Sequence, residues 1–276
     1  MRYSRGFTIF AHVILIVSIL VIAFPVIFAF LVSTHTFQES FAFPPKFHVG
    51  GNIPHNYMTA WKRVDMGRLL FNSTFISVTV SIGKIALSLL AAFAFTYFGE
   101  FRGKYLFFVL ILITHMLPLP IRIVPTFILM NDFHWINTYY ALTIPFFASA
   151  TGTLLFRQFF LTVPTDLSDA ARMDGAGPIK FLWRILFPLS RTNMMALFMI
   201  EFLYMWNQYL WPLIVTNSNE MRVVQIGLKM LLAGEEQAAE WNVIMAGTII
   251  AMIPPLIILF LLQSSFVKGF AMREEK

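Results

Sequence analysis

Long runs of apolar residues, rather than an alternation of polar and apolar positions, dominate this chain. Six such runs can be marked along the sequence: 7–33, 69–98, 105–130, 139–156, 194–215 and 243–266. A helix needs about 17 to 25 residues to cross the hydrocarbon core of a bilayer, and every run is long enough. Because lipid offers no hydrogen-bond partners, each run must satisfy its own backbone as a helix. The pattern predicts an all-α, polytopic membrane protein with six transmembrane helices.

The composition agrees with a membrane protein and excludes several soluble classes. Hydrophobic residues make up 58% of the chain, charged residues only 12%, and the mean hydropathy is +0.73. Soluble domains carry roughly a quarter charged residues. The net charge of +6 does not indicate nucleic-acid binding, because the basic residues are scattered and form no Lys/Arg-rich stripe. With no cysteine, the chain has no disulfide, no thiolate metal site and no cysteine nucleophile.

The distribution of basic residues predicts how the chain is oriented. Most Lys and Arg residues outside the six runs fall on the side that holds both termini. The positive-inside rule places that side in the cytoplasm. On this topology the connections 34–68, 131–138 and 216–242 lie outside the cell, and the long connection 157–193 lies in the cytoplasm.

The long cytoplasmic connection carries the clearest local signals. Residues 163–191 read VPTDLSDAARMDGAGPIKFLWRILFPLSR. Pro164 and the polar residues after it predict the start of a short helix, and Gly175 predicts its end, because a glycine just past a helix can adopt the left-handed conformation. Pro178 fits an early position of the next helix. We therefore expect two short helices joined by a corner.

The first of these helices has two different sides. Leu167, Ala170 and Ala171 share one face, and Asp169 and Arg172 lie opposite. A helix of about two turns is not stable alone in water, and the alanine pair leaves its face nearly flat. We expect another protein to receive this face.

This connection resembles the cytoplasmic signature of the permease subunits of binding-protein-dependent ABC importers. That signature is Glu-Ala-Ala, three residues, Gly, nine residues, Ile, one residue, Leu and Pro. The matching residues here are Asp169, Ala170, Ala171, Gly175, Ile185 and Pro188, with Asp169 replacing the usual Glu and Phe187 the usual Leu. Further strings, among them WNQYLWPL at 206–213, are similar to the carbohydrate class and in particular to its glycerol-3-phosphate permeases.

The resemblance implies the type I ABC importer permease fold and a division of labour among subunits. The implied partners are a second, different permease subunit, an ATPase subunit dimer and a periplasmic or extracellular solute-binding protein, assembled on the bacterial inner membrane. ATP and Mg would be bound by the ATPase and no cofactor by this chain, which contains no phosphate-binding loop motif. The implied cargo is glycerol-3-phosphate, with another sugar or polyol as the alternative.

By the same resemblance, residues 161–192 form a coupling loop whose first helix docks on the ATPase. Its alanines would permit close docking, its charged residues would form ion pairs at the rim, and its glycine would set the corner. The expected ATPase-coupling residues are Leu167, Asp169, Ala170, Ala171, Arg172, Asp174, Gly175, Ile185 and Pro188. The alternative interpretation is a plain connecting loop with ordinary helix caps. We expect an anchor helix and outer loop at 1–68, a permease core at 69–270 and a cytoplasmic tail at 271–276.

Four polar residues lie inside the apolar runs: Lys84, Arg122, Glu201 and Asn207. An ionisable group at membrane depth is costly and generally faces a cavity or a partner. Arg122 lies among prolines and could contact an anionic cargo on the translocation pathway, with Lys84 adding to the field. The alternative is helix packing, with Lys84 and Glu201 as a buried ion pair. We expect Asn207 to hydrogen-bond a neighbouring helix or the partner permease.

Two other classes of membrane protein fit the sequence less well. An intramembrane aspartyl protease needs aspartates within its spans, and every Asp here falls in a connection. A self-contained transporter or channel would show inverted repeats, and the sequence shows none. The histidines have no paired spacing that would indicate a metal site. The sequence therefore predicts a transporter subunit and not an enzyme.

Overall fold

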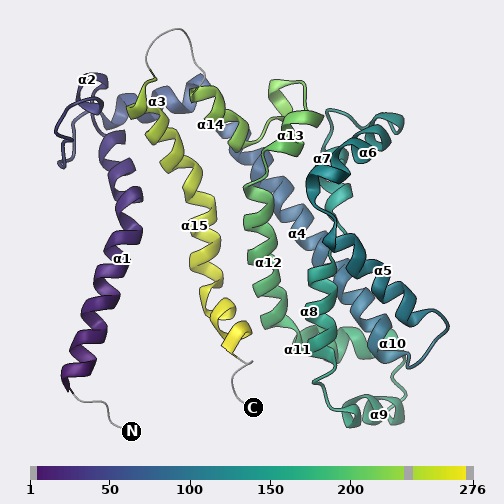
Figure 1. Cartoon of the computed structure of the whole chain (residues 1–276). Helices are drawn as coiled ribbons and strands as arrows, with labels where there is room; N and C mark the ends of the chain where they lie inside the picture. The colour runs from purple at the N-terminus through teal and green to yellow at the C-terminus, as the bar shows by residue number, and fades with distance from the viewer. Residues whose placement is uncertain (1–4, 233–238, 272–276) are drawn as a thin grey trace. The chain divides into compact units, whose positions relative to one another are not determined.

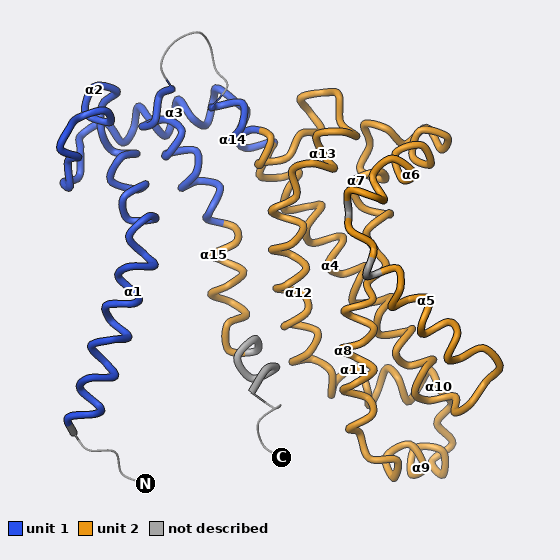
Figure 2. The backbone as a smooth tube through the Cα atoms, viewed as in Figure 1, with its two compact units in different colours: residues 1–68, 227–253 blue, residues 69–226, 254–276 orange. Residues whose placement is uncertain are grey.

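The computed structural model describes residues 5–232 and 239–271, and this part of the chain is helical without any strand (Figure 1). The chain divides into two compact units, one made of residues 1–68 and 227–253 and the other of residues 69–226 and 254–276 (Figure 2). The tail expected at 271–276 lies outside the described residues beyond Ala271. Each unit is described by itself below.

The first unit is built around a long apolar helix, α1 (Arg5–Ser33), whose side chains are exposed over most of its length. Two short helices follow it, α2 (Phe37–Ser40) and α3 (Ile53–Arg63). A buried asparagine, Asn56 of α3, donates from Nδ2 to the carbonyl oxygens of Ser33 and His35 at 2.8 and 2.7 Å. The same side chain accepts a hydrogen bond from Asn242 at 2.8 Å, so it joins three segments of this unit.

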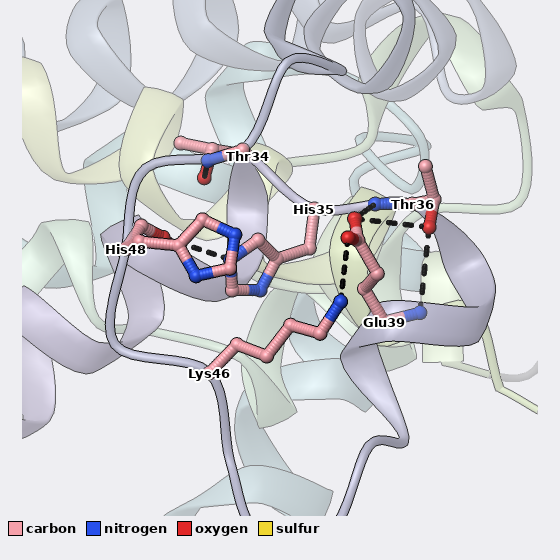
Figure 3. A network of polar contacts seen from close by, with 7 residues as sticks. Thr34, His35, Thr36, Glu39, Lys46 and His48 are labelled. Carbon is pink, nitrogen blue, oxygen red and sulfur yellow. Dashed lines mark hydrogen bonds and ion pairs between the residues drawn. The ribbon is translucent and has the colours of Figure 1, made fainter.

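The loop after α1 contains a network of polar contacts (Figure 3). Thr36 and Glu39 form a reciprocal capping box at the start of α2, and Lys46 Nζ lies 2.8 Å from Glu39 Oε1. Hydrogen bonding from Lys46 lowers the pKa of Glu39 to about 2. The ring of His35 hydrogen-bonds the carbonyl oxygen of His48 at 2.8 Å. Together these contacts fold the loop back on itself.

The second unit holds most of the remaining helices. Its long helix α4 (Met66–Tyr97) has buried apolar residues such as Val80 and Ala92. The elements that follow are α5 (Lys104–Met116), α6 (Leu119–Asp132), α7 (Tyr139–Thr143), the 3-10 turn η1 (Ile144–Phe146), α8 (Ala150–Phe160), α9 (Thr165–Met173), α10 (Pro178–Phe181), the π-helix η2 (Leu182–Leu186), α11 (Phe187–Leu189), α12 (Arg191–Trp206), α13 (Leu210–Val215) and the 3-10 turn η3 (Asn219–Met221). Helices α14 (Val224–Leu232) and α15 (Trp241–Ala271) belong to both units, as do the first residues of α4 up to Arg68.

Two apolar clusters form the core of the second unit. One surrounds Trp211, which is 1% exposed and donates from its indole nitrogen to the carbonyl oxygen of Ala141 at 2.9 Å. The other surrounds Phe156 and combines side chains of α4, α8, α10, η2 and α12. The second cluster lies next to the coupling loop and therefore determines how that loop is held.

Helices long and apolar enough to cross a membrane are Gly6–Ser33, Met66–Tyr97 and Trp241–Ser264 in the described part of the chain. Two bent helix pairs, Tyr139–Phe146 with Ala150–Phe160 and Pro178–Leu189 with Arg191–Trp206, would raise the number of spans to five. A shorter apolar helix covers Lys104–Thr114. The count of six transmembrane helices thus stays a prediction.

The expectation of an unbroken helix over 105–130, 139–156 and 194–215 is wrong. The helices break at 117–118, at 147–149 and at 207–209. Proline explains the first break, because it cannot donate a backbone hydrogen bond and is best accommodated in the first turn of a helix. Pro118 caps α6, and Pro120 lies in its first turn. Because mean hydropathy is taken over many residues, a single proline does not interrupt an apolar run.

Candidate coupling loop and central cavity

The corner after α9 has the geometry that its sequence predicts. Gly175 adopts a left-handed φ of 70°. Its N–H bonds the carbonyl of Arg172 at 3.0 Å, and the N–H of Ala176 bonds the carbonyl of Ala171 at 2.8 Å. These two bonds define a Schellman motif, which satisfies the last carbonyls of a helix. Pro178 then begins α10, as the sequence predicts.

The apolar face of α9 is divided between this chain and solvent. Ala171 is 6% exposed and belongs to the apolar cluster around Phe156. Leu167 is 41% exposed, Met173 is 88% exposed, and Ala170 is also exposed. The expectation that Ala171 docks on another protein is therefore corrected. Its small side chain lets α9 pack closely on its own unit. The Schellman turn also brings Ala176 back toward Ala171.

The charged side of α9 is likewise partly satisfied within the chain. Arg172 Nη1 lies 3.5 Å from Asp169 Oδ1, and the guanidinium carbon lies 5.1 Å from the centre of the Tyr97 ring. Hydrogen bonding to Tyr97 raises the pKa of Arg172 above its usual value. Tyr97 at the end of α4 thus holds Arg172, and the expected role of Arg172 at a rim shared with a partner stays a prediction because its side chain is 55% exposed. Asp174 is exposed at the C-cap of α9.

The last two residues of the signature lie in a bend that the sequence analysis did not anticipate. Ile185 is in the π-helix η2, and Pro188 is in α11 directly after it. Pro188 has no N–H to donate to the carbonyl of Arg184, which is four residues earlier, so the normal helical ladder cannot continue there. The segment Pro178–Leu189 then meets Arg191–Trp206 at an angle of 73°. Pro188 was the signal that could have predicted the irregular turn.

A cavity of about 670 Å³ opens in the second unit beside α4, α8 and α12. Lys84, Arg122 and Glu201 all line it. Lys84 Nζ lies 2.6 Å from Glu201 Oε2, and both residues are buried at 7% and 5% exposure. The structure confirms the ion pair between them that the sequence analysis allowed. It also confirms that Arg122 faces a cavity with polar groups.

Two further polar residues of this cavity were missed by sequence reasoning. Ser149 Oγ donates to Glu201 Oε1 at 3.1 Å, and the ring of Tyr204 lies 4.8 Å from Lys84 Nζ. Ser149 could have been recognised as a helix N-cap before Ala150, since its side chain accepts a hydrogen bond from the Gly152 N–H. No sequence signal indicated the position of Tyr204.

Asn207 lies elsewhere and behaves differently from the expectation. Its Nδ2 donates to the carbonyl oxygen of Leu203 at 2.8 Å, within its own helix, where it forms the C-cap of α12. This bond is made within α12 and not to a neighbouring helix, and the Leu203 carbonyl also accepts from the backbone N–H of Asn207 at 3.2 Å. A bond from Asn207 to the partner permease stays a prediction. Asn207 is not among the residues that line the cavity.

Comparison with known proteins connects these features. Residues 84–271 match the family described as binding-protein-dependent transport system inner membrane component. The sn-glycerol-3-phosphate transport system permease protein UgpE of Agrobacterium fabrum is 43% identical over 274 residues, which is 97% of each chain. The UgpE protein of Yersinia enterocolitica is 41% identical over 277 residues, or 98% of each chain.

Among solved structures, a chain from a bacterial ABC transporter involved in the import of the acidic polysaccharide alginate has the same fold. It superposes with a TM-score of 0.83 at 22% sequence identity, covering 96% of this chain and 99% of that one. The fold is therefore that of a type I ABC importer permease. The chain belongs to the family of binding-protein-dependent transport system inner membrane components, as a permease subunit of an ABC importer whose ATPase is a separate subunit.

Proposed function

We propose that this chain forms one half of the translocation pathway of an importer for glycerol-3-phosphate. Likeness to UgpE permeases over 97% of the chain at 43% identity carries the choice of cargo. The complete importer would contain a second, different permease, an ATPase dimer that holds ATP and Mg, and an external solute-binding protein. Another sugar or polyol is the alternative cargo, because related permeases share much of their sequence.

Coupling to the ATPase is assigned to α9 and the corner after it. Leu167, Ala170 and Met173 are exposed on a helix whose other side is packed, and Ile179 just beyond the corner is 70% exposed. An exposed apolar patch on a short helix is a common feature of a protein interaction site. Asp169 and Asp174 would contribute charges at its edge, and Gly175 would hold the corner.

Force applied to α9 can reach the bundle through contacts within this chain. Ala171 fixes α9 to the cluster around Phe156, and Arg172 fixes it to Tyr97 at the end of α4. Ile185 packs against the same cluster, and Pro188 lies at the bend that leads into α12. These contacts allow a movement of α9 to tilt α4 and α12 together, which supports a coupling role over a plain connecting loop.

Uptake measurements test the cargo directly. A bacterial strain that lacks this chain is compared with the same strain carrying it, using labelled glycerol-3-phosphate, maltose and similar sugars in parallel. Restored uptake of glycerol-3-phosphate alone is the expected result. Restored uptake of a neutral sugar alone would contradict the proposed cargo and leave the importer role standing. An assembly purified without any ATPase would contradict the importer role for this chain.

The proposed orientation places both termini, the coupling loop and the 271–276 tail in the cytoplasm of a bacterial inner membrane, with 1–68 as anchor and 69–270 as core. The chain contains no cysteine, so a single Met173→Cys substitution gives it one thiol. A membrane-impermeant thiol reagent should label this variant in inside-out vesicles and not in intact cells. Equal labelling from outside would contradict the orientation.

A further inference from the structure

The charge balance of the central cavity leaves one cation without an internal partner. Its charged lining residues are Lys84, Arg122 and Glu201. Lys84 and Glu201 neutralise each other across 2.6 Å. Among the side chains that the structure describes, which do not include those of 115, 116 and 119, Arg122 has neither an ion pair nor a side-chain hydrogen bond, and it is exposed and lines the cavity. The cavity therefore carries a net positive charge located at Arg122.

The other charged residues already have partners in the cavity wall. Both carboxylate oxygens of Glu201 are occupied, one by Lys84 and the other by Ser149 Oγ at 3.1 Å. Lys84 is further fixed by its position 4.8 Å from the centre of the Tyr204 ring. Because Lys84 already neutralises the charge of Glu201, the net charge of the cavity remains positive.

The backbone near Arg122 adds to the positive potential. The first turn of α8 lines the cavity through Ser149, Ala150 and Thr151, and the break before α6 lines it through Pro118. A helix N-terminus carries a partial positive charge, and interrupted helices that present such ends toward a cavity favour anions. This feature supports the charge argument and does not carry it alone.

We infer that Arg122 binds the oxyanion of the cargo as it passes through this subunit. The inference rests on the proposed function and adds to it a residue that contacts the cargo. The planar guanidinium can donate two parallel hydrogen bonds to a phosphate, which an ammonium cannot do. The cavity volume of about 670 Å³ is sufficient for a small phosphate monoester.

Substitution of Arg122 in the assembled importer is the first test. Arg122→Gln should lower the uptake rate of glycerol-3-phosphate at least about tenfold, because a charged hydrogen bond is lost, while Arg122→Lys should retain an intermediate rate. Arg102→Gln is the matched control, since Arg102 is exposed outside the cavity. Assembly of the complex should be retained in all three variants, and uptake and basal ATP hydrolysis should be unchanged in Arg102→Gln.

Chemical restoration of the charge gives a sharper test, because the natural chain has no cysteine. The Arg122→Cys variant is treated with a thiosulfonate that adds an ethylammonium group or with one that adds an ethylsulfonate group. The cationic adduct should recover much of the lost uptake, and the anionic adduct should not. Importer with the unsubstituted chain and the Arg102→Cys variant control for effects on other subunits. Glycerol-3-phosphate should slow the reaction of the introduced thiol with either thiosulfonate, and glycerol should not.

The outcomes separate this inference from the proposed function. If the unsubstituted importer does not transport glycerol-3-phosphate, the proposed function fails and the cargo role of Arg122 fails with it. If it does, and Arg122→Gln transports normally, only the inference is overturned. Equal recovery with both adducts, a thiol that does not react, or loss of assembly in Arg122→Gln also overturns it. Protection by anionic lipid and not by cargo would instead identify a lipid headgroup as the bound oxyanion.

Discussion

The coupling loop and the central cavity are stabilised in opposite ways. The corner of the loop is formed by contacts close in sequence, namely a Schellman turn at Gly175 and an exposed ion pair within α9, although Ala171 and Arg172 also attach α9 to distant helices. The cavity is held by a buried ion pair between residues on α4 and α12, which are far apart in the sequence. Exposed pairs contribute little to stability, whereas breaking a buried pair is costly. The loop is thus suited to binding and movement, and the cavity wall to rigidity.

The largest effect is expected from breaking the buried pair. Glu201→Leu should lower the free energy of unfolding by about 3 to 5 kcal/mol, because it leaves Lys84 buried without its counter-charge. The double variant Lys84→Met with Glu201→Leu should regain most of this loss. Thermal unfolding of the purified chain in detergent provides the measurement. A small loss of unfolding free energy in Glu201→Leu would show that water in the cavity solvates Lys84. The difference in stability between the cavity wall and the loop would then be smaller than we infer.

A change at the corner of the loop should have the next largest effect, and on transport rather than insertion. Gly175→Pro cannot adopt φ of 70° and removes the N–H that bonds the carbonyl of Arg172, at a local cost of about 3 kcal/mol. Uptake should be abolished while the chain still inserts into the membrane. Normal uptake would contradict the role of this corner.

Alanine substitutions at two neighbouring glycines isolate the backbone cause. A Cβ at Gly175 or at Gly177 would meet nothing within 4 Å, and only Gly175 has a positive φ. Gly175→Ala should cost about 1 to 2 kcal/mol locally and slow uptake, while Gly177→Ala should leave uptake nearly unchanged. Similar behaviour of the two variants would show that the left-handed conformation is not what matters.

A smaller effect is expected where α9 is attached to α4. Tyr97→Leu removes the ring beneath Arg172 and should raise the number of ATP molecules hydrolysed per transported cargo by about two- to fivefold. Tyr97→Phe keeps the ring and loses the hydroxyl, so it should lie between Leu and the natural residue. Uptake and ATP hydrolysis are measured together in reconstituted vesicles. An unchanged ratio in Tyr97→Leu would argue that force bypasses this contact.

The smallest effect concerns the loop after α1, whose contacts are also close in sequence and exposed. Glu39 has a pKa lowered to about 2 from 4.5 by its bond to Lys46. The contribution of Glu39 to the stability of this loop is therefore complete above pH 4.5 and is lost as pH falls toward 2. Proteolysis of the loop 37–47 by an acid-stable protease should accelerate over this range. Lys46→Gln should shift the acceleration to higher pH, and an identical profile would contradict the assignment.

Features that depend on contacts close in sequence could be predicted, whereas features that depend on contacts between distant helices could not. Gly175 and Pro178 were interpreted correctly because turn chemistry depends on a few adjacent residues. The ion pair of Lys84 and Glu201 could only be offered as one option, because nothing local brings α4 and α12 together. Arg122 was placed near prolines, yet only the structure shows that it has no ion-pair partner among the described side chains.

The errors have physical causes as well. Helical periodicity identified a face containing Ala171 but could not show that this residue packs on its own chain. The same limit applies to Arg172, whose partner Tyr97 lies at the end of a distant helix. The breaks inside apolar runs were missed because hydropathy registers Pro118 as one residue among many, although its missing N–H ends the helix.

The length of α4 has a consequence for how such subunits can diversify. Lys84 and Tyr97 are on the same unbroken helix, and at 1.5 Å per residue they lie about 20 Å apart along its axis. One continuous helix therefore joins the residue that contacts Arg172 of α9 to a residue that lines the cavity, without a relay of side chains between them. Substitutions in the part of α4 that lines the cavity can then alter which solute is carried, while the end that contacts α9 keeps the same coupling to the ATPase.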